Sequence, residues 1–409
     1  MKITAADKQP QLARKIGLLL LALYGLGTIL GAGIYVLIGK VAGEAGMFPP
    51  LAFIVAAGIA AITGLSYSKL VVRYPQSAGV ARYVEEGFHR PWLTTTVGYL
   101  VVFSGVVSSA TLANGFVGYF AAFFQTSSLL VLIVIVLLMG AIALVGIAES
   151  LWLTAAMTAI EIMGLIWIIA LGGDELVLLP ERFPDLFVPK SLGALLGIFS
   201  GAVLAFYAFI GFEDLVNVVE EVKRPEANMP RAIIISIVVA STLYMLISII
   251  AILGLPLDIL IESEAPLRDL VIRDNPQAGD WIGVISLFAI VNGILIQIIM
   301  ASRILYGMAV QKRAPSLFSE VSSLTLTPWF STIFITLTVL VAALWFPLVV
   351  LAKATSFGIL IIFVLINTTL WIFFRRGDVE SAGCVTSLPL VGALLCVALL
   401  VFQIVSVMA

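Results

Sequence analysis

The sequence predicts an all-α membrane protein with about eleven transmembrane helices. Of its 409 residues, 61% are hydrophobic and only 11% are charged, whereas a soluble globular chain carries roughly 25% charged residues. Apolar stretches of about 20 residues recur along the whole chain, and each is long enough to cross the hydrocarbon layer of a membrane. Two of these stretches contain glycine near their centres, which predicts that their helices are broken there.

The eleven apolar stretches are separated by short polar segments. The longest polar segments cover residues 73–91, 172–191 and 255–279, so we expect one transmembrane domain over residues 1–409 and no soluble domain. We place the spans at residues 15–39, 50–72, 92–124, 127–148, 150–171, 192–219, 230–254, 280–308, 329–350, 352–374 and 387–408.

Lysine and arginine are distributed unequally between alternate segments. Sixteen of the 22 lie in one set of segments, which includes the N-terminus, and six lie in the other. Because segments on the cytoplasmic side are enriched in these residues, we expect a multi-pass protein of the cell membrane with a cytoplasmic N-terminus. With an odd number of spans, the C-terminus lies outside.

The first span contains the stretch GLGTILGAGIY at residues 25–35, with four glycines. A second weak point, FSGAVLAFYAFIGFEDL at residues 199–215, lies in the sixth span, which runs in the opposite direction. Interrupted helices at matching places in two oppositely oriented halves are typical of inverted-repeat transporters. We therefore expect repeat one over about 15–171, repeat two over about 192–374, and an extra helix over about 387–408.

Broken helices expose backbone groups that a continuous helix would pair. The freed amides and the N-terminus of a half-helix attract a carboxylate, and the freed carbonyls attract an ammonium group. One site could therefore hold both ends of an amino acid. For the first span alone, the alternative is close helix packing through the GxxxG pair Gly27 and Gly31; the matching break in the sixth span favours a substrate site.

Three stretches resemble a known family when taken together: GTILGAGIY, then FYAFIGFED followed by EEVKRPEANMPRAI, then NGILIQIIMASRILYGMA. In this order they resemble the amino acid–polyamine–organocation (APC) superfamily of amino acid transporters. The resemblance covers nearly the full chain. It implies a five-plus-five inverted repeat in which spans 1, 2, 6 and 7 rock against a scaffold. Many relatives have twelve spans, whereas we count eleven.

The resemblance also implies roles for residues at the two breaks. Those that would present backbone amides to the substrate carboxylate are Gly31, Ala32 and Gly33. Those that would offer backbone carbonyls to the substrate ammonium are Ile29, Tyr207, Ala208 and Ile210. Phe209 and Phe212 are candidates for an aromatic lid over the substrate, and ordinary packing of these rings is the alternative.

The connector EEVKRPEANMPRAI, after the sixth span, resembles a cytoplasmic segment of the family. Its simpler interpretation is topological, because its basic residues keep it inside. Pro230 is then expected at the first position of the seventh helix, where proline is favoured.

The fifth span carries a glutamate, Glu161, at its centre, where many members of the family would have a lysine. Ionisable groups in membrane spans mark ion and proton pathways, and desolvation favours the neutral form of a carboxyl group. Glu161 is therefore our candidate for proton coupling. The alternatives are a permanently neutral acid that bonds to the unwound backbone near Gly27 or Thr28, and a carboxylate in a sodium site.

We expect secondary active transport of an amino acid by alternating access, with uptake coupled to protons. The alternatives are an exchanger without net proton movement and a non-transporting amino acid sensor. No charged residue besides Glu161 is expected to face the pocket, which favours a neutral substrate, small and apolar.

Several other classes of function lack support in the sequence. The net charge of −2 suggests no nucleic-acid partner. Two cysteines and a single histidine, His89, provide neither a disulfide framework nor a metal cluster. We find no phosphate-binding loop and no nucleophile motif, so we expect no cofactor, no metal and no enzymatic activity.

Overall fold

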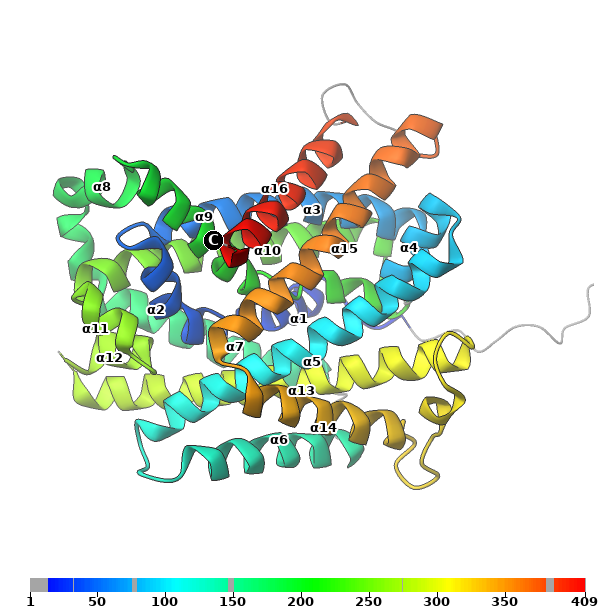
Figure 1. Ribbon diagram of the computed structural model, residues 1–409, viewed down its shortest axis with the longest axis horizontal. Coiled ribbons are helices and arrows are strands. Elements are labelled where there is room, and N and C mark those ends of the chain that lie inside the picture. Colours follow the sequence, from blue (N-terminus) through cyan, green and yellow to red (C-terminus); the bar gives the residue numbers. More distant parts are fainter. Residues whose placement is uncertain are drawn as a thin grey trace, which may run out of the picture.

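The computed structural model describes residues 14–31, 33–75, 79–145, 151–273, 275–379 and 386–408, most of them helical (Figure 1). Among these residues, nine helices are long and apolar enough to cross a membrane, and a pair bent by 54° makes a tenth. An eleventh apolar helix, α14 (Trp329–Trp345), has 17 residues. These helices occupy the eleven positions predicted from the sequence.

The first five spans and the next five contain the same series of elements, each beginning with a broken helix. The first five are α1 (Leu18–Leu30) with α2 (Gly33–Ala45), α3 (Pro49–Arg73), α5 (Pro91–Ala121), α6 (Ser128–Val145) and α7 (Leu151–Leu171). The next five are α9 (Leu192–Tyr207) with η3 (Phe212–Glu221), α10 (Pro225–Gly254), α13 (Pro276–Val310), α14 and α15 (Leu348–Arg376). The last helix is α16 (Leu388–Met408).

Helix packing repeats with an offset of five spans. α3 packs against α9, and their counterparts α10 and α1 pack against each other; α5 packs against α15 in the same way as α13 packs against α7. Corresponding spans also meet directly, in the pairs α2 with α9, α3 with α10, α5 with α13, and α6 with α14. The predicted five-plus-five inverted repeat with broken first and sixth helices is therefore confirmed.

The helices form two groups around the breaks. In Figure 1, α6, α13 and α14 lie together along the lower side, and α3, α9 and α10 lie along the upper side. The broken spans belong with the upper group, because α1 packs against α10 and α2 packs against α9. This grouping matches the expected bundle of spans 1, 2, 6 and 7.

Short helices occupy the segments that the sequence showed only as polar connections. These are α4 (Gly79–Phe88), η2 (Gly173–Leu178), α8 (Leu179–Phe187), α11 (Leu257–Glu262), α12 (Pro266–Ile272) and η4 (Ser316–Ser319). α4 follows the second span and α11 follows the seventh, so these additions also obey the repeat. They are too short to be recognised by their hydrophobic pattern alone.

Ion pairs at the ends of the helices agree with the two predicted sets of basic residues. At one end, Lys353 Nζ at the start of α15 lies 2.6 Å from Glu44 Oε1 at the end of α2. At the other, Arg313 just after α13 lies 3.1 Å from Glu85 of α4. The two sets of basic residues therefore lie at opposite ends of the spans.

Proline explains two of the predicted boundaries that were wrong. The seventh span begins at Pro225, and Pro230 lies inside the helix instead of at its first position. Pro225 takes that position, where the missing N–H breaks no helical hydrogen bond. The ninth span ends at Trp345 instead of residue 350, because Pro347 holds the preceding Phe346 in an extended conformation.

Candidate functional site

The first span is interrupted between α1 and α2. Gly31, directly after α1, has φ −26° and ψ −159°, which lies outside the helical region. Gly33 begins α2 and is buried; Ala32, one of the predicted amide donors, lies outside the described residues. The C-terminus of α1 and the N-terminus of α2 therefore meet inside the protein, each with backbone groups that have no partner within its own helix.

The sixth span is interrupted between α9 and η3. After Tyr207 the chain makes a turn in which the amides of Phe209 and Ile210 bond to carbonyls three residues earlier, at 3.0 and 3.2 Å. Gly211 then adopts φ +131°, a conformation that residues with a Cβ rarely adopt. Its N–H donates to Glu213 Oε2 at 2.9 Å, which fixes the start of η3.

The two breaks fit into each other, and glycine makes this possible. A Cβ added at Gly33 would lie 2.7 Å from the Cα of Ala208, and one added at Gly211 would lie 2.5 Å from the carbonyl carbon of Thr28. The glycine of each break therefore packs against the backbone of the other break. This close approach explains why two membrane helices carry glycine at their centres.

Tyr244 of α10 joins the two breaks by hydrogen bonds. Its hydroxyl lies 2.9 Å from the carbonyl oxygen of Ile29 and 3.0 Å from that of Ala208. A phenol has one proton, so it donates fully to one of these carbonyls at a time. Two of the carbonyls predicted to bind an ammonium group are therefore positioned by a residue that the sequence analysis did not identify.

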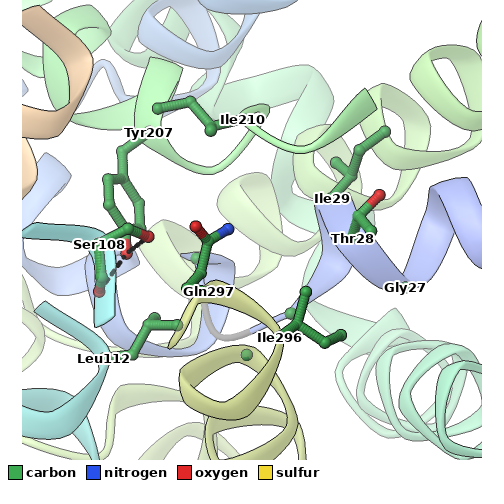
Figure 2. Close-up of a pocket in the computed structure, with 12 residues that line it drawn as sticks. Gly27, Thr28, Ile29, Ser108, Leu112, Tyr207, Ile210, Ile296 and Gln297 are labelled. Carbon is green, nitrogen blue, oxygen red and sulfur yellow. Dashed lines mark hydrogen bonds between the residues drawn. The ribbon is translucent and has the colours of Figure 1, made fainter. Parts of the chain in front are cut away.

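A cavity of about 30 Å³ lies between the breaks and the helices α5 and α13 (Figure 2). This is room for about two water molecules. No charged side chain lines it in the part of the chain that the structure describes. The lining residues are Gly27, Thr28, Ile29, Gly31, Gly33, Ser108, Leu112, Tyr207, Ile210, Gly293, Ile296 and Gln297.

Five of the residues predicted to bind substrate line this cavity, and Ala208 and Phe209 do not. The five are Ile29, Gly31, Gly33, Tyr207 and Ile210. Ala208 lies beside the cavity, against Gly33. The geometry thus brings together groups from both broken spans, and their contacts with a substrate stay a prediction.

The two rings considered for an aromatic lid are packed within the protein. The Phe209 ring lies 5.2 Å from the ring of Tyr244 and does not line the cavity. The Phe212 ring packs against the rings of Tyr67 and Phe363, at centroid distances of 5.8 and 5.3 Å. In this conformation both rings have the environment expected for ordinary packing.

The opposite wall of the cavity comes from α5 and α13, and its individual residues were not predicted. Figure 2 shows the Tyr207 hydroxyl directed at Ser108; the two hydroxyl oxygens are 2.9 Å apart. Leu112 and Gln297 lie nearby. These residues sit in long apolar spans whose hydrophobicity is nearly uniform around the helix, so the sequence alone did not indicate which face meets the breaks.

Glu161 of α7 is buried, with 2% of its surface exposed. Its Oε1 accepts a long hydrogen bond of 3.5 Å from Asn292 of α13, and its Oε2 has no partner among the described residues. Tyr35 of α2 donates to the Glu161 backbone carbonyl at 3.2 Å. The side-chain partner is thus Asn292, whereas the alternative of a neutral structural acid had placed it at Gly27 or Thr28.

The far ends of the two broken spans are also joined. The amide of Ile16, before α1, donates to the carbonyl of Glu221 at 3.0 Å, and the amide of Lys223 donates back to Ile16 at 2.9 Å. The first and sixth spans are therefore held together both at their breaks and at one end.

Comparison with known proteins identifies the family. Residues 16–408 match the family model described as amino acid permease. The chain belongs to the amino acid permease family. This confirms the resemblance to APC-superfamily amino acid transporters that the sequence motifs indicated.

Two relatives and one solved structure show how this permease compares with known proteins. It is 30% identical over 390 residues to cationic amino acid transporter 4, vacuolar, from Arabidopsis thaliana, which covers 87% of the chain but only 62% of that transporter. It is 27% identical over 400 residues to the branched-chain amino acid permease BcaP from Bacillus subtilis (strain 168), covering 91% and 84% of the two chains. The fold is similar to that of MhsT in complex with L-phenylalanine, with a TM-score of 0.63, 15% identity, and coverage of 97% and 100%.

The relatives are transporters rather than enzymes, which supports amino acid transport as the class of function. Their names differ in substrate, since one is cationic and the other branched-chain. Membership of the family therefore does not determine the substrate of this chain.

Proposed function

We propose that this permease takes up a neutral amino acid across the cell membrane by alternating access, together with a proton. The observation that carries the proposal is the meeting of two broken helices at a buried cavity. Gly31, Gly33, Ile29 and Ile210, which line that cavity, carry backbone amides and carbonyls at the breaks. These groups suit a carboxylate and an ammonium group held close together.

A neutral substrate agrees with the chemistry of the lining. A buried ammonium or guanidinium side chain would require a carboxylate partner, because an unpaired buried charge is very costly. The described part of the lining offers hydroxyl, amide and apolar groups only. This favours a neutral substrate over the cationic one named for the Arabidopsis relative.

Alternating access would use the two helix groups of the fold. α3 and α10 pack against the broken spans, and Tyr244 of α10 bonds to both breaks. These helices can therefore tilt as one unit against α5 and α13. Substrate that bridges the breaks and the opposite wall binds best when these groups are close, which shifts the population toward an occluded state. The distribution of Lys and Arg favours an N-terminus in the cytoplasm and a C-terminus outside.

Glu161 is the proposed proton carrier. An ionisable side chain inside a membrane span is costly and marks an ion or proton pathway by default. Glu161 lies on α7, a helix that contacts both α1 and α13, and one of its oxygens has no protein partner in the described structure. A proton on that oxygen would change the contact between the moving group and the scaffold.

The test is uptake of a panel of labelled amino acids into proteoliposomes, with and without an inward proton gradient, for wild type and Glu161→Gln. We expect gradient-stimulated uptake in the wild type. In the variant, stimulation should be lost while counterflow persists. Glu181→Gln on α8, an exposed glutamate, is the matched control and should behave as wild type.

Other outcomes distinguish the alternatives. Exchange that does not depend on the proton gradient and is unchanged in Glu161→Gln would refute proton coupling and indicate an exchanger. Binding of an amino acid without uptake or counterflow would refute transport and indicate a sensor.

A further inference from the structure

The wall of the cavity that faces the breaks determines which side chain a substrate can carry. α5 and α13 contribute Ser108, Leu112, Gly293, Ile296 and Gln297 to it. On the proposed function, the carboxylate and ammonium of the substrate bind at the breaks. The side chain then points at α5 and α13.

Most hydroxyl groups around the cavity already donate to protein acceptors. Thr28 Oγ1 donates to the carbonyl of Gly25 at 2.9 Å. The Tyr207 hydroxyl lies 2.9 Å from Ser108 Oγ and 3.2 Å from the Ser108 carbonyl, so this pair can satisfy both of its protons internally. These groups are therefore poor candidates for donating to a substrate.

Gln297 differs from these hydroxyl groups because its polar group is not bonded to the described protein. Its side chain is directed into the cavity (Figure 2), only 8% of the residue is exposed, and no hydrogen bond joins its amide to another described residue. A carboxamide has two N–H donors and one acceptor oxygen. A substrate group that fills the cavity excludes water from this amide. It must then hydrogen-bond to the amide itself or leave the amide unpaired, which is costly.

We infer that Gln297 selects a small neutral amino acid whose side chain carries a hydroxyl or a carboxamide. Both groups offer a donor and an acceptor to the Gln297 amide. A charged side chain would find no opposite charge in the described lining, and Leu112, Ile210 and Ile296 leave little room for a large one. This inference rests on the proposed function and replaces the apolar substrate expected from the sequence.

The test compares threonine with valine, which have similar shapes but differ by a hydroxyl in place of a methyl group. Wild type should transport threonine with a kcat/KM about ten-fold above that for valine, the factor that corresponds to one ordinary hydrogen bond. Gln297→Met keeps the length of the side chain and removes the amide. In this variant the ratio should fall close to one, chiefly through loss of threonine transport.

Gln403→Met is the matched control. Gln403 is also a buried amide, but it donates to the carbonyl of Lys353 at 2.8 Å, outside the cavity. Its substitution should leave the threonine-to-valine ratio as in wild type. Gln297→Asn, which keeps a shorter amide, is the second variant if Gln297→Met does not fold. Threonine should then be preferred over valine in both wild type and Gln297→Asn.

Failure of the inference and failure of the proposed function give different results. Valine transported as well as threonine, transport of only cationic or large apolar amino acids, or an unchanged ratio in Gln297→Met would each overturn the inference and leave amino acid transport standing. No uptake or counterflow of any amino acid would overturn the proposed function as well.

Discussion

The contact between the two broken spans can be tested by one methyl group. Gly211→Ala places a Cβ 2.5 Å from the carbonyl carbon of Thr28 and in overlap with the carbonyl oxygen. The neighbour is backbone rather than the end of a flexible side chain, so it cannot turn aside. The substitution also forces alanine to φ +131°, a region that only glycine adopts readily.

The expected loss of stability follows from these two effects. A residue with a Cβ held in a disfavoured backbone region costs about 1–3 kcal/mol, and overpacking a well-packed core costs about 1–3 kcal/mol. If the two add, Gly211→Ala loses about 2–6 kcal/mol of folding free energy. This is a large share of the roughly 5–15 kcal/mol that stabilises a typical folded protein.

The assay is thermal unfolding of the purified permease in detergent, with transport in proteoliposomes as a second readout. We expect a clearly lower melting temperature and loss of uptake for Gly211→Ala. Gly58→Ala is the matched control, because Gly58 is exposed in α3 and has no neighbour within 4 Å of an added Cβ. Inside a helix this change is expected to gain up to about 1 kcal/mol.

An unchanged or raised melting temperature for Gly211→Ala would refute the argument. It would mean that the two spans do not approach each other at this position in the folded protein. A similar loss in Gly58→Ala would also refute it, because the effect would then come from changing any glycine in a membrane helix.

Two further substitutions test bonds between the spans. Tyr244→Phe keeps the ring but removes the hydroxyl that bridges the breaks, and should cost about 1–3 kcal/mol because buried carbonyls lose a donor. Tyr99→Phe removes a 3.3 Å bond to the carbonyl of Arg313 at an exposed position and should cost less. Equal melting temperatures for the two variants would contradict the bridge. Lys353→Met removes the half-buried 2.6 Å pair with Glu44 and should lower stability by about 1 kcal/mol, the upper end for partly exposed pairs. Lys40→Met removes a 3.4 Å pair whose partner is exposed, and should lower stability by less in the same thermal assay. A larger loss for Lys40→Met than for Lys353→Met would show that burial does not determine how much these ion pairs contribute.

The sequence was most informative where a residue type has a local cost. Gly31, Gly33 and Gly211 lie in apolar stretches where glycine lowers the intrinsic propensity for a helix, so the order of residues alone was enough to locate the breaks. The spans could be located for the same reason, because every one of them must be apolar over the thickness of a membrane.

The sequence was least informative where the role of a residue depends on what lies opposite. Tyr244 and Gln297 are each one of several polar residues in a long apolar span. Nothing local distinguishes a polar residue that bridges two breaks from one that bonds within its own helix. Pro230 shows the same limit at a boundary, because two prolines five residues apart both suited the start of a helix. The structure shows that Pro225 begins the helix, directly after the segment in which Glu221 and Lys223 bond to Ile16.

The mutual fit of the breaks has a consequence for mechanism. Gly33 lies against the sixth span and Gly211 against the first, so neither break can move far without displacing the other. On the proposed mechanism, a substrate held between them therefore acts on both halves of the repeat at once. Glu161 lies outside this pair, on a helix that contacts both α1 and α13. On the same proposed mechanism, a proton taken up by Glu161 would change the contact between the tilting helices and α13, and proton and substrate would be coupled without touching each other.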